Sequence, residues 1–351
     1  MLFWNYKKCM FCLRSGELIR TFKFVNFTLH DKNVCLLFLS NEKHYLAILV
    51  LRKQFRDMFL FKLFPLLSIV AAAGEWPALK TTWGFNIFGS AFHDRPRTVA
   101  EAEKDGWTLI GSCDGQWLGH RYADPADPSL LMIYDDAGYI AGVQSGLLKS
   151  DVDESVGNFA NLPIYQSGDF FGEPAYFTTA YFVDPEVICN GGRTEDDFNK
   201  FGTGDRLLFQ VGATPDQLYA APLTQDEADA NSDWYDHYCF LGMGDHYIQY
   251  NYTPDQDCAA VLPIQVLYDQ GVLNGFVWQH LAGLPGDKWE HPDETAIGAI
   301  IDRPPTCLLD SVAYPGLSTM HHYFYSYPWL VLCPLKHDRG SLNGYKKVMK
   351  K

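Results

Sequence analysis

The sequence predicts a mainly β fold with minor short helices, built as a duplicated β unit whose two halves have a pseudo-twofold relation. Three observations support this prediction. Short apolar runs flank glycine-containing turns, a set of motifs recurs in one order along the chain, and six cysteines lie in the part that we expect to fold. The six cysteines further predict three disulfides.

Two segments carry the pattern of β-hairpins. Residues 130–143 and 264–277 each contain an apolar run, a Tyr-Asp pair and two glycines. Apolar runs on both sides of a short turn with glycine are typical of hairpins. Residues 176–183, 206–211 and 322–333 are rich in aromatic and β-branched side chains and are further strand candidates.

Helix signals are few and short. Residues 98–101 (TVAE) and 224–227 (TQDE) are both capping boxes, in which the first and fourth side chains satisfy N–H groups at a helix start. We expect the first helix to end at Gly106 and the second near Asn231.

The two halves share motifs in the same order. Cys113 and Cys239 each precede a histidine at C-x6-H spacing, and a tyrosine follows that histidine. Each half then contains its hairpin pattern and closes with an aromatic stretch, a proline and a cysteine, over residues 181–189 and 324–333. We interpret this order as a duplication. The alternative is two aromatic-rich hairpins that fall at similar spacing.

Cysteine positions follow the same division. Three of the nine cysteines, Cys9, Cys12 and Cys35, precede the hairpin-rich region, and six remain. An even set in an oxidising compartment predicts disulfides, and a duplication favours equivalent bonds in each half. The predicted pairs are Cys113–Cys189, Cys239–Cys333 and, as an extra bond in the second half, Cys258–Cys307.

The start of the chain resembles a secretory leader. Residues 58–73 hold a short apolar run that ends in Ala71-Ala72-Ala73, a pattern that predicts a signal peptide cleaved before Gly74. The run is about 15 residues long, shorter than the roughly 20 that a membrane span needs. Residues 1–57 are then a non-native or disordered leader. The alternative is a type II membrane protein with a short basic arm.

Charge reverses at the same boundary. Residues 1–73 contain 11 Lys+Arg and 4 Asp+Glu, whereas residues 74–351 contain 17 and 38. We therefore divide the chain into a first β unit (74–212), a second β unit (213–334) and a disordered basic tail (335–351).

The acidic composition bears on location and partners. Phosphate binding needs clustered Lys and Arg, so the composition predicts no nucleic-acid partner. We expect a secreted, extracellular protein without stable membrane insertion once the signal is removed. Asn251-Tyr252-Thr253 is an N-glycosylation sequon, which predicts a glycoprotein. The sequence assigns neither a cofactor nor an oligomeric state.

Paired histidines are the first candidates for chemistry. His120 and His246 occupy the same place in the C-x6-H motif, and Tyr122 and Tyr247 follow them. Residues at matched repeat positions often meet across a pseudo-twofold axis, where an acid/base pair would form. The alternative is that each histidine forms local hydrogen bonds that fix the loop after its cysteine.

A metal site is the second candidate. Asp236, His237 and His246 combine imidazole and carboxylate groups within a short stretch, the ligand types that transition metals use. The acidic run over residues 226–236 lacks the spacing of a calcium loop, so we interpret it as a solvated loop.

These observations leave three functions open. The first is extracellular binding of a small or apolar ligand between the two β halves, for which the many aromatic residues provide a lining. The second is a secreted enzyme, either a hydrolase or an oxidoreductase, that uses the paired histidines as acid/base groups or metal ligands. The third is an acidic structural or matrix protein.

Overall fold

The computed structural model describes residues 21–29, 32–41, 44–51, 76–84 and 91–333. The chain divides into two compact units, Met1–Val70 and Ala71–Lys351. The predicted signal peptide (58–73) and basic tail (335–351) lie outside the described residues.

The Met1–Val70 unit contains a three-stranded antiparallel sheet. Its strands are β1 (Thr21–Leu29), β2 (Lys32–Asn41) and β3 (His44–Leu51), in the order β1-β2-β3. These strands lie within residues 1–57, for which a non-native or disordered leader stays a prediction. Apolar runs over 34–39 and 45–51 provide segments that can pair as strands.

The first sheet of the Ala71–Lys351 unit is antiparallel, in the order β13-β12-β11-β9-β8-β7-β6, with β10 paired to β11. Its strands are β6 (Thr108–Ser112), β7 (His120–Asp124), β8 (Asp127–Tyr134), β9 (Ile140–Leu148), β10 (Gln166–Phe170), β11 (Glu173–Tyr181), β12 (Leu208–Gln210) and β13 (Leu218–Ala220).

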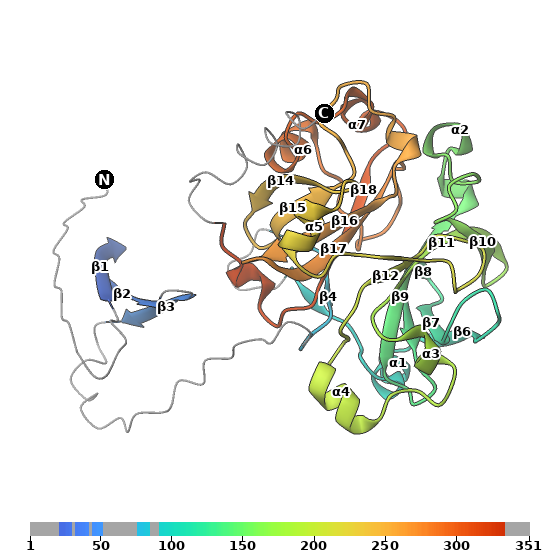
Figure 1. The fold of residues 1–351 in the computed structure, drawn as a ribbon, viewed down its shortest axis with the longest axis horizontal. Coiled ribbons are helices and arrows are strands. Elements are labelled where there is room, and N and C mark those ends of the chain that lie inside the picture. Colours follow the sequence, from blue (N-terminus) through green and yellow to red (C-terminus); the bar gives the residue numbers. More distant parts are fainter. Residues whose placement is uncertain (1–20, 30–31, 42–43, 52–75, 85–90, 334–351) are drawn as a thin grey trace. The chain divides into compact units, whose positions relative to one another are not determined.

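The second sheet is also antiparallel, in the order β14-β15-β16-β17-β18-β4-β5. Its strands are β14 (Tyr235–Phe240), β15 (Gly244–Ile248), β16 (Ile264–Asp269), β17 (Val272–His280), β18 (Ser318–Tyr323), β4 (Lys80–Thr81) and β5 (His93–Asp94). In Figure 1 the second sheet lies in the upper part of this unit, and the first lies below it and to the right.

Two sequence-based boundaries need correction. Strands β4 and β5 belong to the segment assigned to the first unit (74–212), yet they complete the second sheet by pairing with β18. The chain therefore does not change from one sheet to the other at a single point. The strand expected over 322–333 ends at Tyr323, and the 3-10 turn η5 (Pro328–Leu330) occupies part of the remaining segment.

Helices are short, as predicted. They are α1 (Val99–Lys104), α2 (Glu154–Gly157), α3 (Pro185–Ile188), α4 (Glu195–Phe201), α5 (Gln225–Ala230), α6 (Glu294–Ile300) and α7 (Thr306–Ser311), with 3-10 turns η3 (Lys149–Asp151), η4 (Cys258–Ala260) and η5 (Pro328–Leu330). Both predicted capping boxes form, at Thr98 and at Thr224.

The two sheets match in local detail as well as in strand order. In the first half, the hydroxyl of Tyr134 donates to the carbonyl of Pro96, just before α1. In the second half, the hydroxyl of Tyr268 donates to the carbonyl of Pro222, just before α5. A register shift precedes both tyrosines in their hairpins. These matches support duplication, and the pseudo-twofold relation between the halves stays a prediction.

All three predicted disulfides form. The bonds are Cys113–Cys189, Cys239–Cys333 and Cys258–Cys307. The first two bonds are equivalent in the two halves. Each joins a cysteine before the hairpin, Cys113 or Cys239, to a cysteine after the last long strand, β11 or β18.

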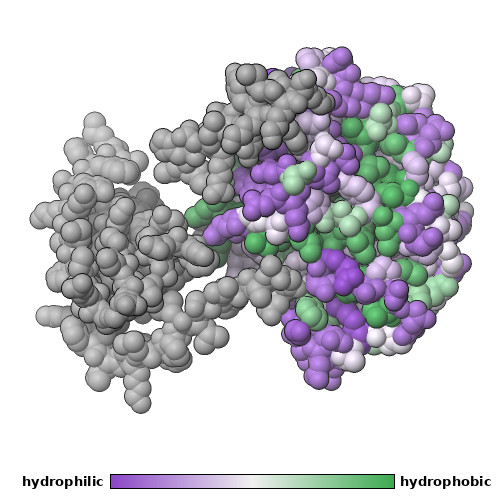
Figure 2. Space-filling model, viewed as in Figure 1, coloured by the Kyte–Doolittle hydropathy of each residue, from purple (hydrophilic) through white to green (hydrophobic). Residues whose placement is uncertain are grey.

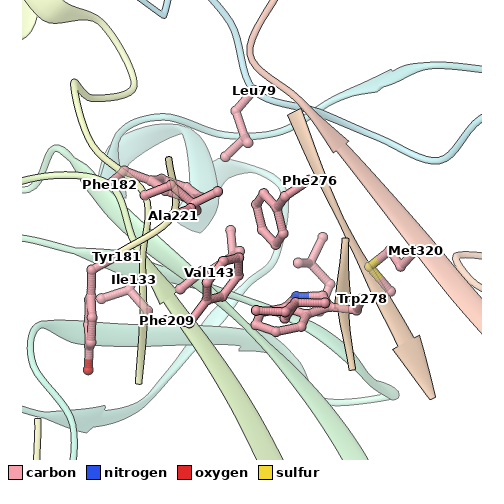
Figure 3. Close-up of a cluster of buried hydrophobic side chains, with 14 of the residues drawn as sticks. Leu79, Ile133, Val143, Tyr181, Phe182, Phe209, Ala221, Phe276, Trp278 and Met320 are labelled. Atoms are coloured by element: carbon pink, nitrogen blue, oxygen red, sulfur yellow. The ribbon is translucent and has the colours of Figure 1, made fainter. Parts of the chain in front are cut away.

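One apolar core joins the two sheets. Figure 3 shows Phe182 and Phe209 from the first half next to Phe276 and Trp278 of β17. The ring of Phe276 lies 5.5 Å from that of Phe209 and 6.1 Å from that of Phe182, and all three are fully buried. Side chains therefore fill the space between the halves over most of their contact.

We expect Phe276→Ala to lower the free energy of unfolding by about 3–5 kcal/mol, because the truncation leaves a cavity where the two sheets meet. Urea denaturation followed by circular dichroism measures the loss. Leu109→Ala is the matched control, since Leu109 is 47% exposed, and it should change stability by less than about 0.5 kcal/mol. Equal effects of both substitutions would contradict a shared core centred on Phe276.

Candidate functional site

His120 lies at the start of β7 and is hydrogen-bonded on both sides. Its Nδ1 is 3.0 Å from the hydroxyl of Ser112, and its Nε2 is 3.1 Å from a carboxylate oxygen of Asp136. The other oxygen of Asp136 accepts from the backbone N–H of Gly191, next to the disulfide at Cys189. His120 thus links Ser112 at the end of β6 to the turn between β8 and β9, and Asp136 links that turn to the loop at Gly191.

His120 and His246 do not occupy equivalent strand positions. His120 pairs with Tyr134 across β7 and β8, whereas the residue that pairs with Tyr268 is Asp245. The glycine before each pair fixes this alignment. Gly119 and Gly244 both have positive φ, and a Cβ on either would meet the carbonyl oxygen of the paired tyrosine. The C-x6-H match is therefore one residue out of register.

His246 is enclosed within the second half. Its side chain is fully buried, and its Nδ1 lies 3.1 Å from the carbonyl oxygen of Tyr238. Burial, with a contribution from the nearby His321, lowers the pKa of His246 to about 3. The hydrogen bonds of His246 therefore lie within the second half, whereas those of His120 lie within the first.

Tyr122 and Tyr247 are matched, and each reaches a helix of its own half. The hydroxyl of Tyr122 donates to Glu103 at 3.3 Å, and that of Tyr247 donates to Asp229 at 2.7 Å. Burial is the main cause that raises the pKa of each hydroxyl, and the carboxylate adds to it. These bonds attach α1 and α5 to their sheets.

The predicted metal ligands do not assemble around one point. Within residues 76–84 and 91–333, no three His, Cys, Asp or Glu side chains are placed to hold a metal ion. The Nδ1 of His237 accepts from the backbone N–H of Asp302, and Asp236 accepts from the hydroxyl of Tyr252. Adjacent strand residues point to opposite faces, which separates Asp236 from His237.

The structure contains a pocket at the seam between the two halves, which sequence reasoning did not identify. Tyr250 and Gln279 are its buried polar residues from the second half, and Tyr165 is the one from the first half. The remaining lining residues are apolar or small: Gly157, Leu162, Cys258, Val261, Pro263 and Leu281. We call this set the seam pocket.

Hydrogen bonds fix the polar wall of the seam pocket. The side-chain amide of Gln279 donates to the hydroxyl of Tyr250 at 2.6 Å, and Gln265 donates to Gln279 at 2.5 Å. The hydroxyl of Tyr165 is 3.0 Å from Nδ1 of His280. Burial raises the pKa of both tyrosines, so their hydroxyls stay neutral hydrogen-bonding groups.

The seam pocket is a small depression that is partly open to solvent, and its free space is about that of one water molecule. The sequence contains one indication of the seam pocket. Gln265, Gln279 and His280 are polar residues at the ends of otherwise apolar strands, and buried polar side chains need partners. Their partners come from distant segments, so spacing along the chain does not reveal the pocket.

We expect Tyr250→Phe to cost about 1–3 kcal/mol of unfolding free energy, because it leaves the buried amide of Gln279 without one acceptor. Thermal and urea unfolding measure the change. Tyr327→Phe removes the same hydroxyl from a tyrosine that is 62% exposed and should have no measurable effect. A Tyr250→Phe variant as stable as the parent protein would show that the amide finds another partner.

The described residues include no helix that is long and apolar enough to cross a membrane. The sequence matches no protein-family model, and comparisons with curated proteins and with solved structures find no match.

Proposed function

We propose that this chain is a secreted extracellular protein that binds a small, largely apolar and uncharged molecule in the seam pocket. The seam pocket itself carries the proposal, because apolar walls with a few convergent polar groups are typical of small-molecule sites. It also lies where both halves contribute residues, which is a common place for such sites.

The lining defines the chemistry of the ligand. It contains no Lys, Arg, Asp, Glu or His, so a charged group would enter without a counter-charge. Leu162, Val261 and Leu281 favour an apolar body. The amide of Gln279 and the hydroxyl of Tyr250 favour one oxygen-bearing head group.

The charge of the surface also favours an uncharged ligand over an anion. Residues 74–351 carry 38 acidic and 17 basic side chains, an excess that repels anions. Hydrophilic residues cover much of the face seen in Figure 2, with hydrophobic ones between them. The small pocket restricts the ligand to a compact molecule, such as a phenol or a cyclic alcohol, and even such a molecule enters only if the lining side chains move.

The binding test uses phenol and cyclohexanol as probes, with thermal shift and isothermal titration calorimetry. Leu162→Trp and Val261→Trp place a large ring at the pocket and should abolish the shift. Leu218→Trp introduces the same ring at a partly exposed residue outside the pocket and should preserve it. If no probe binds the parent protein, or if the filled variants bind as well as the parent, the seam pocket is not the site.

Secretion is supported by the three disulfides, which persist in oxidising compartments. The sequon adds a direct test. Asn251 is exposed, and the hydroxyl of Thr253 donates to its side-chain oxygen at 2.7 Å.

We expect protein collected from the medium of a eukaryotic secretory host to lose mass on enzymatic removal of N-glycans. Asn251→Gln should abolish that loss, whereas Asn231→Gln, at an asparagine outside a sequon, should leave it unchanged. Retention of all the protein inside the cell would contradict secretion.

A second candidate function rests on one specific observation. Ser112, His120 and Asp136 form a hydrogen-bonded chain of hydroxyl, imidazole and carboxylate, the groups of a nucleophilic serine site. Ser112 is exposed and next to the Cys113–Cys189 bond. The matching reaction is ester hydrolysis, in which His120 accepts the Ser112 proton as the oxygen attacks the carbonyl.

A fluorophosphonate probe separates this candidate from binding. In labelling, the Ser112 oxygen bonds to phosphorus, fluoride leaves, and His120 takes the proton. Ser112→Ala should remove the label, while Ser155→Ala, at another exposed serine that bonds an aspartate, should retain it. An unlabelled parent protein would exclude the hydrolase reading.

A further inference from the structure

A buried hydrogen bond between Tyr165 and His280 joins the two halves beside the seam pocket, where the side-chain amide of Asn158 also donates to the carbonyl of Ala259. Tyr165 lies before β10 in the first half, and His280 is the last residue of β17 in the second. The Tyr165 hydroxyl is 3.0 Å from His280 Nδ1. His280 is fully buried and Tyr165 is 8% exposed. Tyr165 also lines the pocket, so this bond positions part of the pocket wall.

Among the described residues, no charged side chain contacts the His280 ring to compensate a proton on it. The rings of Trp278, on the same strand, and Trp289, in the following loop, lie 6.4 Å and 5.4 Å from it. From β18, its pairing partner is the neutral Ser318, whose hydroxyl is 3.3 Å from His291. Lys288, next to Trp289, is already paired with Asp127. Tyr165 is the titratable group in direct contact, and burial keeps it neutral.

Protonation changes what His280 requires. A neutral imidazole has one N–H donor and one acceptor nitrogen, whereas an imidazolium has two donors and a positive charge. Nε2 of His280 is buried and has no hydrogen-bond partner among the described residues. The charged form would therefore hold an unsatisfied donor and an uncompensated charge in an apolar environment, and both are relieved only if the ring reaches water.

We propose that the Tyr165–His280 contact is an acid-sensitive latch, and that acidification opens the seam between the two halves at the pocket. This assigns a regulation to the seam pocket and, for ligand release, rests on the proposed binding function. Opening of the latch itself requires no ligand.

The direction follows from the two protonation equilibria. Burial lowers the pKa of His280 to about 3 in the folded protein, against about 6.5 in an unfolded chain. The open form binds the proton more readily, so acid favours opening. The closed seam is fully stable above about pH 6.5 and loses stability progressively down to about pH 3. At about pH 4.5, two pH units below the open-state pKa, opening should be favoured about 100-fold more than at pH 7.

Hydrogen exchange on the ligand-free full chain tests the latch. Protection of residues 157–165 and 276–284, corrected for the intrinsic pH dependence of exchange, is compared at about pH 7 and about pH 4.5 with residues 130–147 as the internal reference. In the parent protein we expect the seam segments to lose about 100-fold protection relative to the reference. His280→Gln keeps a neutral hydrogen-bonding group and should remove most of this loss.

The controls distinguish the latch from general acid sensitivity. His291→Gln alters an exposed histidine near the same strand and should leave the loss unchanged. An unchanged seam in the parent protein at about pH 4.5, or equal loss in parent and His280→Gln, would overturn the proposal. If His280→Gln does not fold, Tyr165→Phe provides the test: it removes the bond that closes the seam, so the seam segments should already lose protection at about pH 7, and protection equal to that of the parent at about pH 7 would overturn the proposal.

The outcome is independent of ligand binding. If phenol and cyclohexanol fail to bind but the parent protein loses seam protection in acid, the binding function is wrong and the latch stands. If they bind equally at both pH values and seam protection is unchanged, the latch is wrong and the binding function stands.

Discussion

The shared aromatic core between the two sheets is the constraint on which the rest of the Ala71–Lys351 unit depends. Phe276 of β17 packs among rings from both halves, and Trp278 on the same strand packs 5.3 Å from Phe209. Neither sheet can bury its inner face without the other. Because aromatic rings fill the contact, a ligand can enter only where the core ends.

The seam pocket lies at such an end. There β16 begins, with Gln265 as its second residue, and β17 ends in Gln279 and His280. The buried polar groups of these three residues need partners. The tyrosines Tyr165 and Tyr250 supply those partners from separate loops. At this edge of the core, polar side chains take the place of apolar ones. They form the hydrogen-bonding wall of the seam pocket, and they include His280, whose burial disfavours protonation.

The features that match in the two halves are contacts that stabilise the fold, and none of them forms a catalytic site. Tyr122 and Tyr247 hold α1 and α5 against their sheets through carboxylates, and the equivalent disulfides hold the loops around the hairpins. The residues with distinctive chemistry are the ones that do not match. His120 is bonded to Ser112 and Asp136, whereas its counterpart in the second half is an aspartate.

The sequence alone determined the β class, the short capped helices and all three disulfide pairs. These depend on patterns that are local or that repeat: alternation within a hairpin, four-residue capping boxes, and the same order of cysteines in each half. It named Tyr122 and Tyr247 as a pair, but their offsets from His120 and His246 differ, and only the strand pairing shows that they match. About the site, it indicated only that polar residues end two buried strands.

Tertiary structure decided the register and the site. The segment between Cys239 and Gly244 is one residue shorter than the segment between Cys113 and Gly119. The residue of the second half that is equivalent to His120 in strand pairing is therefore Asp245 and not His246. The transfer of β4 and β5 to the second sheet likewise depends on pairing between residues far apart in the chain. Burial, which sets the protonation of His246 and His280, arises only when both sheets pack. For these physical reasons the seam pocket and the Tyr165–His280 contact follow from the fold and not from any spacing in the sequence.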